Sequence, residues 1–302
     1  MTTPAAPVAG GPSLREVIRR SASYLERHGI ERPRPEVETL LMHLLGTDRA
    51  GLYARRRGLD VRTAQALGRA LCRRAAGTPL QHVTGEQQFL DLVLRVEPGV
   101  FVPRPETEGL VLAALEALEG WPSPAVVDVG TGTGAVALAI ASRRPDARVL
   151  ATDVSAEAVA LARANAERLG LPVEVLRGDL LGPVPAELRG RLALLVSNPP
   201  YLDPEAYDDL PAEVRADPYE ALVGGTDVHR RLAGAAVAWL APGGWLALEI
   251  GDAQAGEVRD LILAALPGAR VEVRPDLAGR DRVVLARAPG VPGSDARDLG
   301  AR

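Results

Sequence analysis

The tetrapeptide Asn198-Pro199-Pro200-Tyr201 carries the clearest chemical information in the sequence, and it follows the apolar run 192–197. The chemistry of this segment suits a substrate with a planar NH2 group. Such a group offers two N–H donors, so a site that binds it needs two acceptors. The side-chain oxygen of Asn198 and the backbone carbonyl of Pro199 can supply them. The prolines limit Asn198 to extended conformations and hold both acceptors in place. The two oxygens would stabilise positive charge that grows on the nitrogen during methyl transfer, while Tyr201 packs on the planar group and excludes water.

A glycine-rich segment, Asp128-Val129-Gly130-Thr131-Gly132-Thr133-Gly134, follows an earlier apolar run. Glycines permit a tight turn and let a ligand approach the backbone at a helix N-terminus. Asp153 comes 23 residues after Gly130, where an acidic side chain accepts both hydroxyls of a ribose. This spacing predicts a ribose-containing cofactor. The loop alone is compatible with NAD, with S-adenosylmethionine, or with a turn that binds no ligand.

Two further aspartates bear on the choice of cofactor. Asp128 precedes the first glycine by two positions. An acidic residue at this position, expected to face the methionine end of S-adenosylmethionine, resembles the motif of class I methyltransferases rather than that of dehydrogenases. Asp179, followed by Leu180, comes after the third apolar run, where such enzymes often bind the adenine amino group. Taken alone, Asp179 is better explained as an ordinary loop aspartate.

From residue 125 onward, apolar strand-like runs alternate with amphipathic helical segments. The predicted strands cover 125–129, 148–152, 173–176, 192–197, 245–250, 270–274 and 282–286, and helices begin near Gly134, Ser155, Asp227 and Ala253. This alternation predicts an α/β fold, a doubly wound seven-stranded sheet with helices on both faces. The last two strands are separated only by the loop 275–281, so they are expected to be antiparallel at the sheet edge.

The first part of the chain has a different pattern. Apolar residues recur at helical spacing from Ser13 to Ala76, which predicts about four helices, and Ser13 with Glu16 forms a capping-box pattern. Between Phe89 and Val102 the sequence predicts a β-hairpin around a Pro-Gly turn. The predicted organisation is a disordered N-terminus (1–12), a helical substrate-recognition domain (13–85), a hairpin linker (86–105), a methyltransferase domain (106–288) and a disordered tail (289–302).

Composition excludes several classes of protein. The chain has 302 residues, of which 47% are hydrophobic, so a sizeable core is expected. There is no apolar run of about 20 residues and no signal-peptide pattern, which predicts a cytoplasmic protein without a membrane span. A single cysteine and four scattered histidines give no disulfide framework and predict no metal site.

Charge differs between the two parts of the chain. Residues 1–80 contain 14 Arg and 7 Asp or Glu, a net charge of +7, whereas the remaining 21 basic and 32 acidic residues give −11. The basic part predicts an acidic partner or simply a solvated helical surface.

With these motifs, the sequence resembles the HemK/PrmC family of glutamine-N5 protein methyltransferases, which modify the glutamine of the Gly-Gly-Gln motif in peptide-chain release factors. The resemblance extends from about Ser13 to Arg287. It includes residues 79–85, Phe89, 102–108 (Val-Pro-Arg-Pro-Glu-Thr-Glu), 128–134, Asp153, 198–201, 248–251 (Leu-Glu-Ile-Gly), Gln254 and 281–283.

The resemblance implies a helical domain that binds the release factor, a hairpin linker and a class I methyltransferase domain with S-adenosylmethionine as cofactor. It implies that 130–134, Asp153, Leu180 beside Asp179, and Asn198 line the cofactor site. It also implies that 198–201 hold the substrate glutamine and that Phe101 forms a wall of that pocket. Release factors are largely acidic, which suits the basic N-terminal part.

Two positions depart from the family pattern, Asp217 before Pro218 and His229 after Val228. Neither is expected to contact the residues assigned to chemistry. The alternatives are glutamine methylation of a ribosomal protein, amino methylation of adenine in DNA or RNA, and a non-catalytic factor-binding protein. The acidic catalytic part argues against direct nucleic-acid binding, and a monomer is expected.

Overall fold

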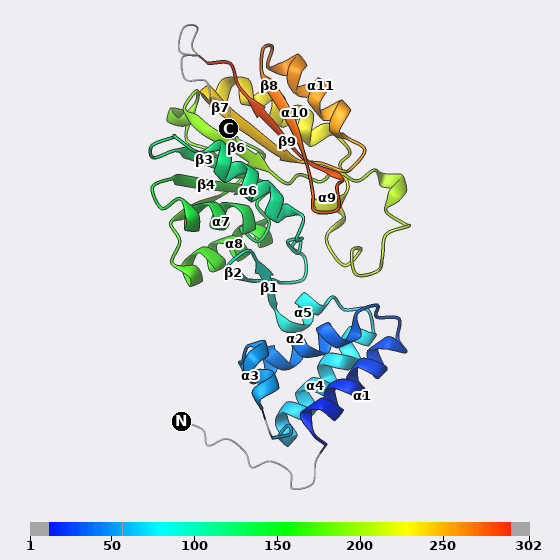
Figure 1. Cartoon of the computed structure of the whole chain (residues 1–302). Helices are drawn as coiled ribbons and strands as arrows, with labels where there is room; N and C mark the ends of the chain where they lie inside the picture. The colour runs from blue at the N-terminus through cyan, green and yellow to red at the C-terminus, as the bar shows by residue number, and fades with distance from the viewer. Residues whose placement is uncertain (1–11, 56, 291–302) are drawn as a thin grey trace, which may run out of the picture. The chain divides into compact units, whose positions relative to one another are not determined.

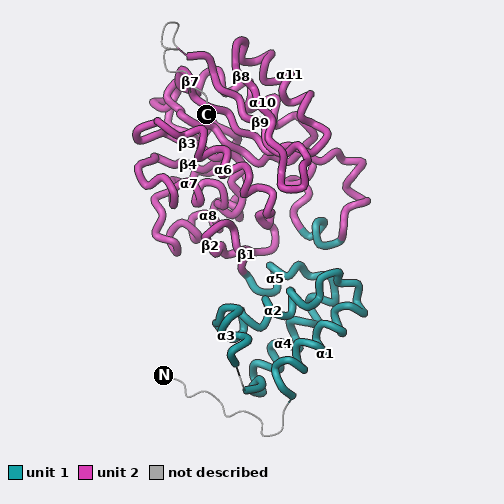
Figure 2. Tube along the Cα trace, in the orientation of Figure 1, with its two compact units in different colours: residues 1–85, 212–216 teal, residues 86–211, 217–302 magenta. Residues whose placement is uncertain are grey.

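The computed structural model describes residues 12–55 and 57–290. The chain divides into two compact units, one formed by residues 1–85 with 212–216 and the other by residues 86–211 with 217–302 (Figure 2). In the described part, no helix is both long and apolar enough to span a membrane.

The first unit is helical. Its helices are α1 (Leu14–Glu26), α2 (Pro33–Leu45), α3 (Arg49–Ala54), α4 (Val61–Ala75) and the short α5 (Leu80–Thr84). The Ser13 hydroxyl accepts a hydrogen bond from the Glu16 backbone N–H at 3.3 Å, as the capping pattern predicts. The Glu16 carboxylate does not complete the capping box, because it pairs with Arg19 and Arg20.

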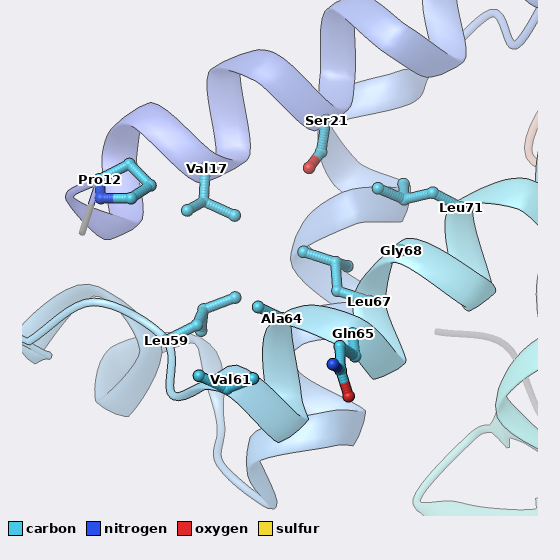
Figure 3. Close-up of a pocket in the computed structure, with 10 residues that line it drawn as sticks. All are labelled: Pro12, Val17, Ser21, Leu59, Val61, Ala64, Gln65, Leu67, Gly68 and Leu71. Atoms are coloured by element: carbon cyan, nitrogen blue, oxygen red, sulfur yellow. The ribbon is translucent and has the colours of Figure 1, made fainter. Parts of the chain in front are cut away.

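Leucines from α1 to α4 form the core of the helical unit, among them Leu25, Leu41 and Leu52, all fully buried. The buried guanidinium of Arg74 pairs with Glu36 at 2.6 Å and with Glu213 of the segment 212–216 at 2.9 Å. Beside this core, α1 and α4 border a largely apolar groove of about 500 Å³ (Figure 3). It is lined by Pro12, Val17, Ser21, Leu59, Val61, Ala64, Gln65, Leu67, Gly68 and Leu71.

The hairpin consists of β1 (Glu86–Phe89) and β2 (Leu92–Arg95), paired antiparallel. Its turn is therefore at residues 90–91, and the prediction of a turn at Pro98-Gly99 was wrong. The left-handed backbone of Leu90 (φ +52°) closes the turn, and its N–H donates to the Glu108 carboxylate at 2.8 Å. Local sequence patterns do not indicate a turn at this position, because the Glu108 contact is long-range and the residues of β1 are mostly polar.

The second unit contains the predicted α/β sheet (Figure 1). Its strands are β3 (Ala125–Val129), β4 (Arg148–Asp153), β5 (Val173–Arg177), β6 (Leu192–Ser197), β7 (Leu240–Glu249), β8 (Arg270–Pro275) and β9 (Asp281–Arg287). Its helices are α6 (Thr107–Ala117), α7 (Ala135–Arg143), α8 (Ala156–Leu169), α9 (Tyr219–Leu222), α10 (Asp227–Trp239) and α11 (Ala255–Ala265), with 3-10 turns at Ala186–Leu188 and Pro204–Ala206.

The strand order is β5-β4-β3-β6-β7-β9-β8. The first five strands in this order are parallel, and β9 is antiparallel to both β7 and β8, which confirms the antiparallel pair at the edge. Neighbouring residues of β3 face opposite sides of the sheet. Val126 packs with α6, α7 and α8, whereas Val127 packs with α10 and α11. Helices therefore cover both faces, as the continuous apolar runs predict.

Candidate functional site

Three polar segments follow three adjacent strands at the same edge of the sheet. Val129 at the end of β3 is in register with Thr152 of β4 and Ser197 of β6. Because parallel strands present their carboxyl ends at one edge, the glycine-rich loop, Asp153 and Asn198 begin side by side. The sheet topology thus brings together residues far apart in the sequence.

The glycine-rich loop has a backbone that favours glycine. Gly130, Gly132 and Gly134 have φ values of +71°, +56° and +87°. A Cβ atom on Gly130 or Gly132 would meet no atom within 4 Å, so the backbone there borders open space. At Gly134 a Cβ would lie 2.9 Å from a Leu138 methyl group and 3.3 Å from the Ala162 Cβ, so little space is left there for a side chain. The loop is an open cradle of backbone at the start of α7.

Asp153 is tied to this loop. One carboxylate oxygen accepts from the Gly132 N–H at 2.9 Å, and the other accepts from the Ser155 N–H at 2.9 Å. Both donors are backbone N–H groups, so the orientation of the carboxylate is fixed. Its remaining lone pairs can still accept hydrogen bonds from hydroxyl groups. This geometry suits the ribose-binding role predicted for Asp153.

Asp128 lies beneath the loop, 1% exposed. Its Oδ2 atom accepts from the Thr131 hydroxyl at 2.6 Å and from the Ala137 N–H at 3.2 Å. Burial raises the pKa of this carboxyl to about 7, although the two hydrogen bonds oppose the shift. Thr133 is also buried, and its carbonyl accepts from the Asn165 amide at 3.0 Å. These buried polar contacts fix the shape of the loop from below.

Asp179 and Leu180 differ from each other in exposure and conformation. The Asp179 side chain is exposed and forms an ion pair with Arg231 of α10. Leu180 has a left-handed backbone (φ +46°), a strained conformation of the kind that clusters at ligand-binding sites. No local sequence pattern indicates the contact between Asp179 and Arg231.

The Asn198–Tyr201 turn is held by side chains from three other segments. The Asn198 side-chain amide donates to the Thr107 hydroxyl at 3.0 Å. The Tyr201 hydroxyl lies 3.5 Å from the Glu249 carboxylate, and its carbonyl accepts from the Gln254 amide at 2.8 Å. No local pattern assigns a role to Thr107, Glu249 or Gln254, although all three lie within segments that carry the family resemblance.

The prolines of the turn are packed against neighbouring chain. Pro199 is buried and Pro200 is half-buried. A Cβ on Gly224 would lie 2.7 Å from the Pro200 carbonyl oxygen, so only glycine permits this approach. The turn is therefore constrained by its own prolines and by the loop that precedes α10.

Phe101 has unexpected neighbours. The Asp217 carboxylate accepts from the Val102 N–H at 3.1 Å and forms an ion pair with Arg104, whose guanidinium lies 5.4 Å from the centre of the Phe101 ring. Burial raises the pKa of Asp217, and the charge of Arg104 opposes that shift. Asp217 thus contacts the two residues Val102 and Arg104 of the segment after Phe101, and none of the residues assigned to chemistry is among its hydrogen-bond partners. Its partners are more than 110 positions away in the chain, beyond the reach of local patterns.

His229, the second departure, is fully buried, and its Nε2 atom hydrogen-bonds the Glu249 backbone carbonyl at 2.9 Å. Burial lowers the pKa of this imidazole, which keeps it neutral as a donor. The residue thus supports the strand end next to Tyr201.

The residues present fit a nucleoside cofactor with a charged methionine end. The open glycine backbone accepts a close ligand, and the fixed Asp153 carboxylate can bind ribose hydroxyls. Residues 130–134, Asp153 and Asn198 would hold S-adenosylmethionine, which would supply a methyl group for transfer.

Comparison with known proteins agrees with this geometry. The family model described as PrmC N-terminal domain matches residues 16–85, and that described as Methyltransferase small domain matches residues 91–216. Among solved structures, the T. thermophilus 16S rRNA N2 G1207 methyltransferase aligns with a TM-score of 0.50 and 23% identity, over 67% of this chain and 49% of its own. This likeness concerns the fold, and the second unit has the class I methyltransferase fold, whose cofactor is S-adenosylmethionine.

Curated relatives extend over nearly the whole chain. The release factor glutamine methyltransferase of Moorella thermoacetica is 44% identical over 91% of this chain and 98% of its own. That of Deinococcus radiodurans is 43% identical over 92% of this chain and 99% of its own. The chain belongs to the release factor glutamine methyltransferase family.

Proposed function

We propose that this protein transfers the methyl group of S-adenosylmethionine to the side-chain amide nitrogen (N5) of the glutamine in the Gly-Gly-Gln motif of peptide-chain release factors. The observation that carries the proposal is the orientation of Asn198. Its NH2 group donates to Thr107, so its Oδ1 atom is free to accept from a substrate amide at the end of β6. Family membership supplies the class of substrate.

Substrate binding needs two acceptors. An amide nitrogen is a weak nucleophile because its lone pair is delocalised into the carbonyl. Asn198 Oδ1 and the Pro199 carbonyl would each accept one N–H of the glutamine amide and orient the nitrogen. The conformational limits of the two prolines keep these oxygens fixed before substrate binds, so little reorganisation is needed.

The same oxygens act during the reaction. S-adenosylmethionine, when bound, supplies a methyl group on a positively charged sulfur. As positive charge grows on the glutamine nitrogen, the two fixed oxygens stabilise it. Tyr201 packs on the planar amide and excludes water, and Phe101 closes another side of the pocket. The extra proton leaves the nitrogen after transfer, so the site needs no strong base.

The cofactor residues have separate roles in the proposal. Residues 130–134 would border the cofactor, Asp153 would bind its ribose hydroxyls, and Asp179 with Leu180 would contact the adenine. The buried Asp128 supports the loop at the methionine end. Of these residues, Asp128 acts through hydrogen bonds within the protein, whereas the others would contact the cofactor.

The helical unit is the proposed recognition domain for the release factor. Its basic character suits an acidic protein partner, since residues 1–80 have a net charge of +7 from 14 Arg and 7 acidic residues. We further propose that the enzyme acts as a monomer in the cytoplasm and binds no nucleic acid directly. Release factors act in translation, which places the substrate in that compartment.

The test is methyl transfer from labelled S-adenosylmethionine to a purified release factor and to a matched copy in which the Gly-Gly-Gln glutamine is replaced by alanine. Label on the first protein and none on the second is the expected result. Label on neither, with S-adenosylhomocysteine binding intact, would contradict the proposal. Ribosomal proteins and nucleic acids would then be assayed as substrates.

A further inference from the structure

Residues 217–225, which we call the return segment, are bound at one end to the residue that follows the Asn198–Tyr201 turn. The Leu202 N–H donates to the Leu222 carbonyl at 2.9 Å, and the Gly224 N–H donates to the Leu202 carbonyl at 3.0 Å. This end of the return segment therefore has its position fixed by the turn that is proposed to hold the substrate amide.

Asp217, at the other end of the return segment, is a buried carboxylate with two partners. Its side chain is 1% exposed. Its Oδ1 atom accepts from the Val102 N–H at 3.1 Å, and its Oδ2 atom accepts from the guanidinium of Arg104. A buried charge is costly without its partners, so these two contacts fix the direction of the carboxylate. Through them Asp217 holds the segment 101–104.

The segment 101–104 contains Phe101, the proposed wall of the substrate pocket. Phe101 is half-buried between Val100 and Val102, which are both buried, so its ring has fewer protein neighbours than the side chains beside it. The Arg104 guanidinium lies 5.4 Å from the centre of the ring, within the range of a cation–π contact. Arg104 therefore connects the Phe101 ring with Asp217.

The chain from Phe101 to Thr107 is held by different contacts at its two ends. At Thr107, where α6 begins, the hydroxyl accepts from the Asn198 amide at 3.0 Å. At Phe101 the polar contacts are those that Asp217 makes with Val102 and Arg104. Loss of the Asp217 carboxylate would therefore loosen the Phe101 end and leave the Asn198 contact in place.

We propose that Asp217 is a positioning residue for methyl transfer, which acts through Val102 and Arg104 to hold the Phe101 ring at the substrate pocket. The inference rests on the proposed function, because Phe101 closes the pocket for the glutamine amide in that proposal. Asp217 itself touches neither substrate nor cofactor. A displaced ring leaves the bound amide less often in the orientation that reacts, which lowers the rate of transfer.

The first experiment compares two substitutions of Asp217. Asp217→Asn keeps an oxygen for the Val102 N–H and loses the charge that pairs with Arg104, whereas Asp217→Ala loses both partners. For methylation of a purified release factor, kcat is expected to fall about tenfold in Asp217→Asn and about a hundredfold in Asp217→Ala. The KM for the release factor should change less, because the pocket binds only one side chain of that protein.

Asp209→Asn is the matched control, since it removes the same charge from an exposed aspartate. Its kcat is expected to equal that of the unsubstituted enzyme. The affinity for S-adenosylhomocysteine should be the same in all of these proteins, which shows that the cofactor half is intact. An Asp217→Ala variant with the kcat of Asp209→Asn would overturn the inference.

The second experiment distinguishes positioning of Phe101 from general support of the structure. If Asp217 acts through Phe101, its substitution has no further effect once the ring is absent. Phe101→Ala alone and Phe101→Ala combined with Asp217→Asn should then have the same kcat within about twofold. Losses that multiply instead would overturn the inference, because they would show that Asp217 supports the structure or the reaction independently of the ring.

The outcomes separate the two proposals. If the unsubstituted enzyme binds S-adenosylhomocysteine and does not methylate release factors, the proposed function fails and this inference fails with it. If the enzyme is active and the Asp217 variants keep its kcat, only the inference is overturned. Should those variants not fold, Arg104→Gln replaces them with and without Phe101→Ala, since the Arg104 side chain is 29% exposed. A kcat unchanged by Arg104→Gln alone would then overturn the inference.

Discussion

The glycine-rich loop and the Asn198–Tyr201 turn follow neighbouring strands, but different contacts hold them in shape. The loop depends on Asp128, which lies 3 and 9 positions from its partners, and on Asp153 and Asn165, which lie 21 and 32 positions from theirs. The turn depends on Thr107 and Glu249, which are 91 and 48 positions away from their partners. The contacts that hold the cofactor half thus span shorter distances in the sequence than those that hold the substrate half.

This difference has a functional meaning. A glycine-rich loop with one hydrogen-bonded carboxylate suits a cofactor that many enzymes share, because such a binding site requires only a turn and one acidic side chain. A site that must distinguish the two ends of an amide needs side chains with fixed proton directions. Damage to each half should therefore appear in different kinetic constants.

The largest effect is expected from Asn198→Ala, which breaks the substrate half. Loss of one charge-stabilising oxygen should lower kcat for methylation of the release factor by about a hundredfold to a thousandfold. Single-turnover assays would measure this, with S-adenosylhomocysteine binding as the control for the cofactor half. Near-normal turnover would show that Asn198 does not stabilise the transition state.

Asp128→Asn tests whether the buried Asp128 carboxyl, which supports the cofactor half, makes the free energy of unfolding depend on pH. The folded protein holds a proton on Asp128 up to about pH 7, whereas an unfolded aspartate releases it near its ordinary pKa of about 4. The stabilising effect of this proton is complete at low pH and is lost as pH rises between these values. The free energy of unfolding should therefore fall less steeply with pH in Asp128→Asn.

Urea denaturation of the cofactor-free protein at several pH values would measure the difference between Asp128→Asn and the unsubstituted protein. Glu249, whose pKa is also raised to about 7, acts in the same direction in both proteins and cancels. Parallel curves for the two proteins would mean that Asp128 is already ionised in the fold.

Gly132→Ala strains the loop that forms the cradle. At φ +56° an alanine costs about 1–2 kcal/mol relative to glycine, so S-adenosylmethionine affinity should fall about tenfold while kcat at saturating cofactor changes less. Gly234→Ala is the matched control, since Gly234 is an exposed position of helix α10 and its Cβ would meet nothing within 4 Å. Calorimetric titration would compare them, and equal affinities would contradict a strained cradle.

The smallest effect is expected at Arg231. Its ion pair with Asp179 is exposed, so Arg231→Ala should change the free energy of unfolding by less than about 1 kcal/mol. Asp179→Ala should in addition weaken cofactor binding by about 1 kcal/mol, the value of one hydrogen bond to adenine. Equal cofactor affinities in the two variants would remove Asp179 from the cofactor site.

Local patterns predicted most of the α/β unit. The apolar runs gave β3 and β6 with the observed bounds, and the short loop before β9 gave the antiparallel edge. The hairpin was misplaced because its turn at Leu90 depends on Glu108, and the contacts of Asp217 with the Phe101 segment were missed for the same reason. Sequence spacing contains no signal for such pairs.

The sequence by itself determined the elements, the motifs at the strand ends and the family, because periodicity, glycine and proline act through neighbouring residues. Only the tertiary structure decided which side chains surround the Asn198 amide and in which direction they donate. Burial at the sheet edge brings Thr107 and Glu249 to Asn198 and Tyr201 and removes the competing water. Away from water, each proton must find a protein acceptor, and those acceptors come from distant parts of the chain.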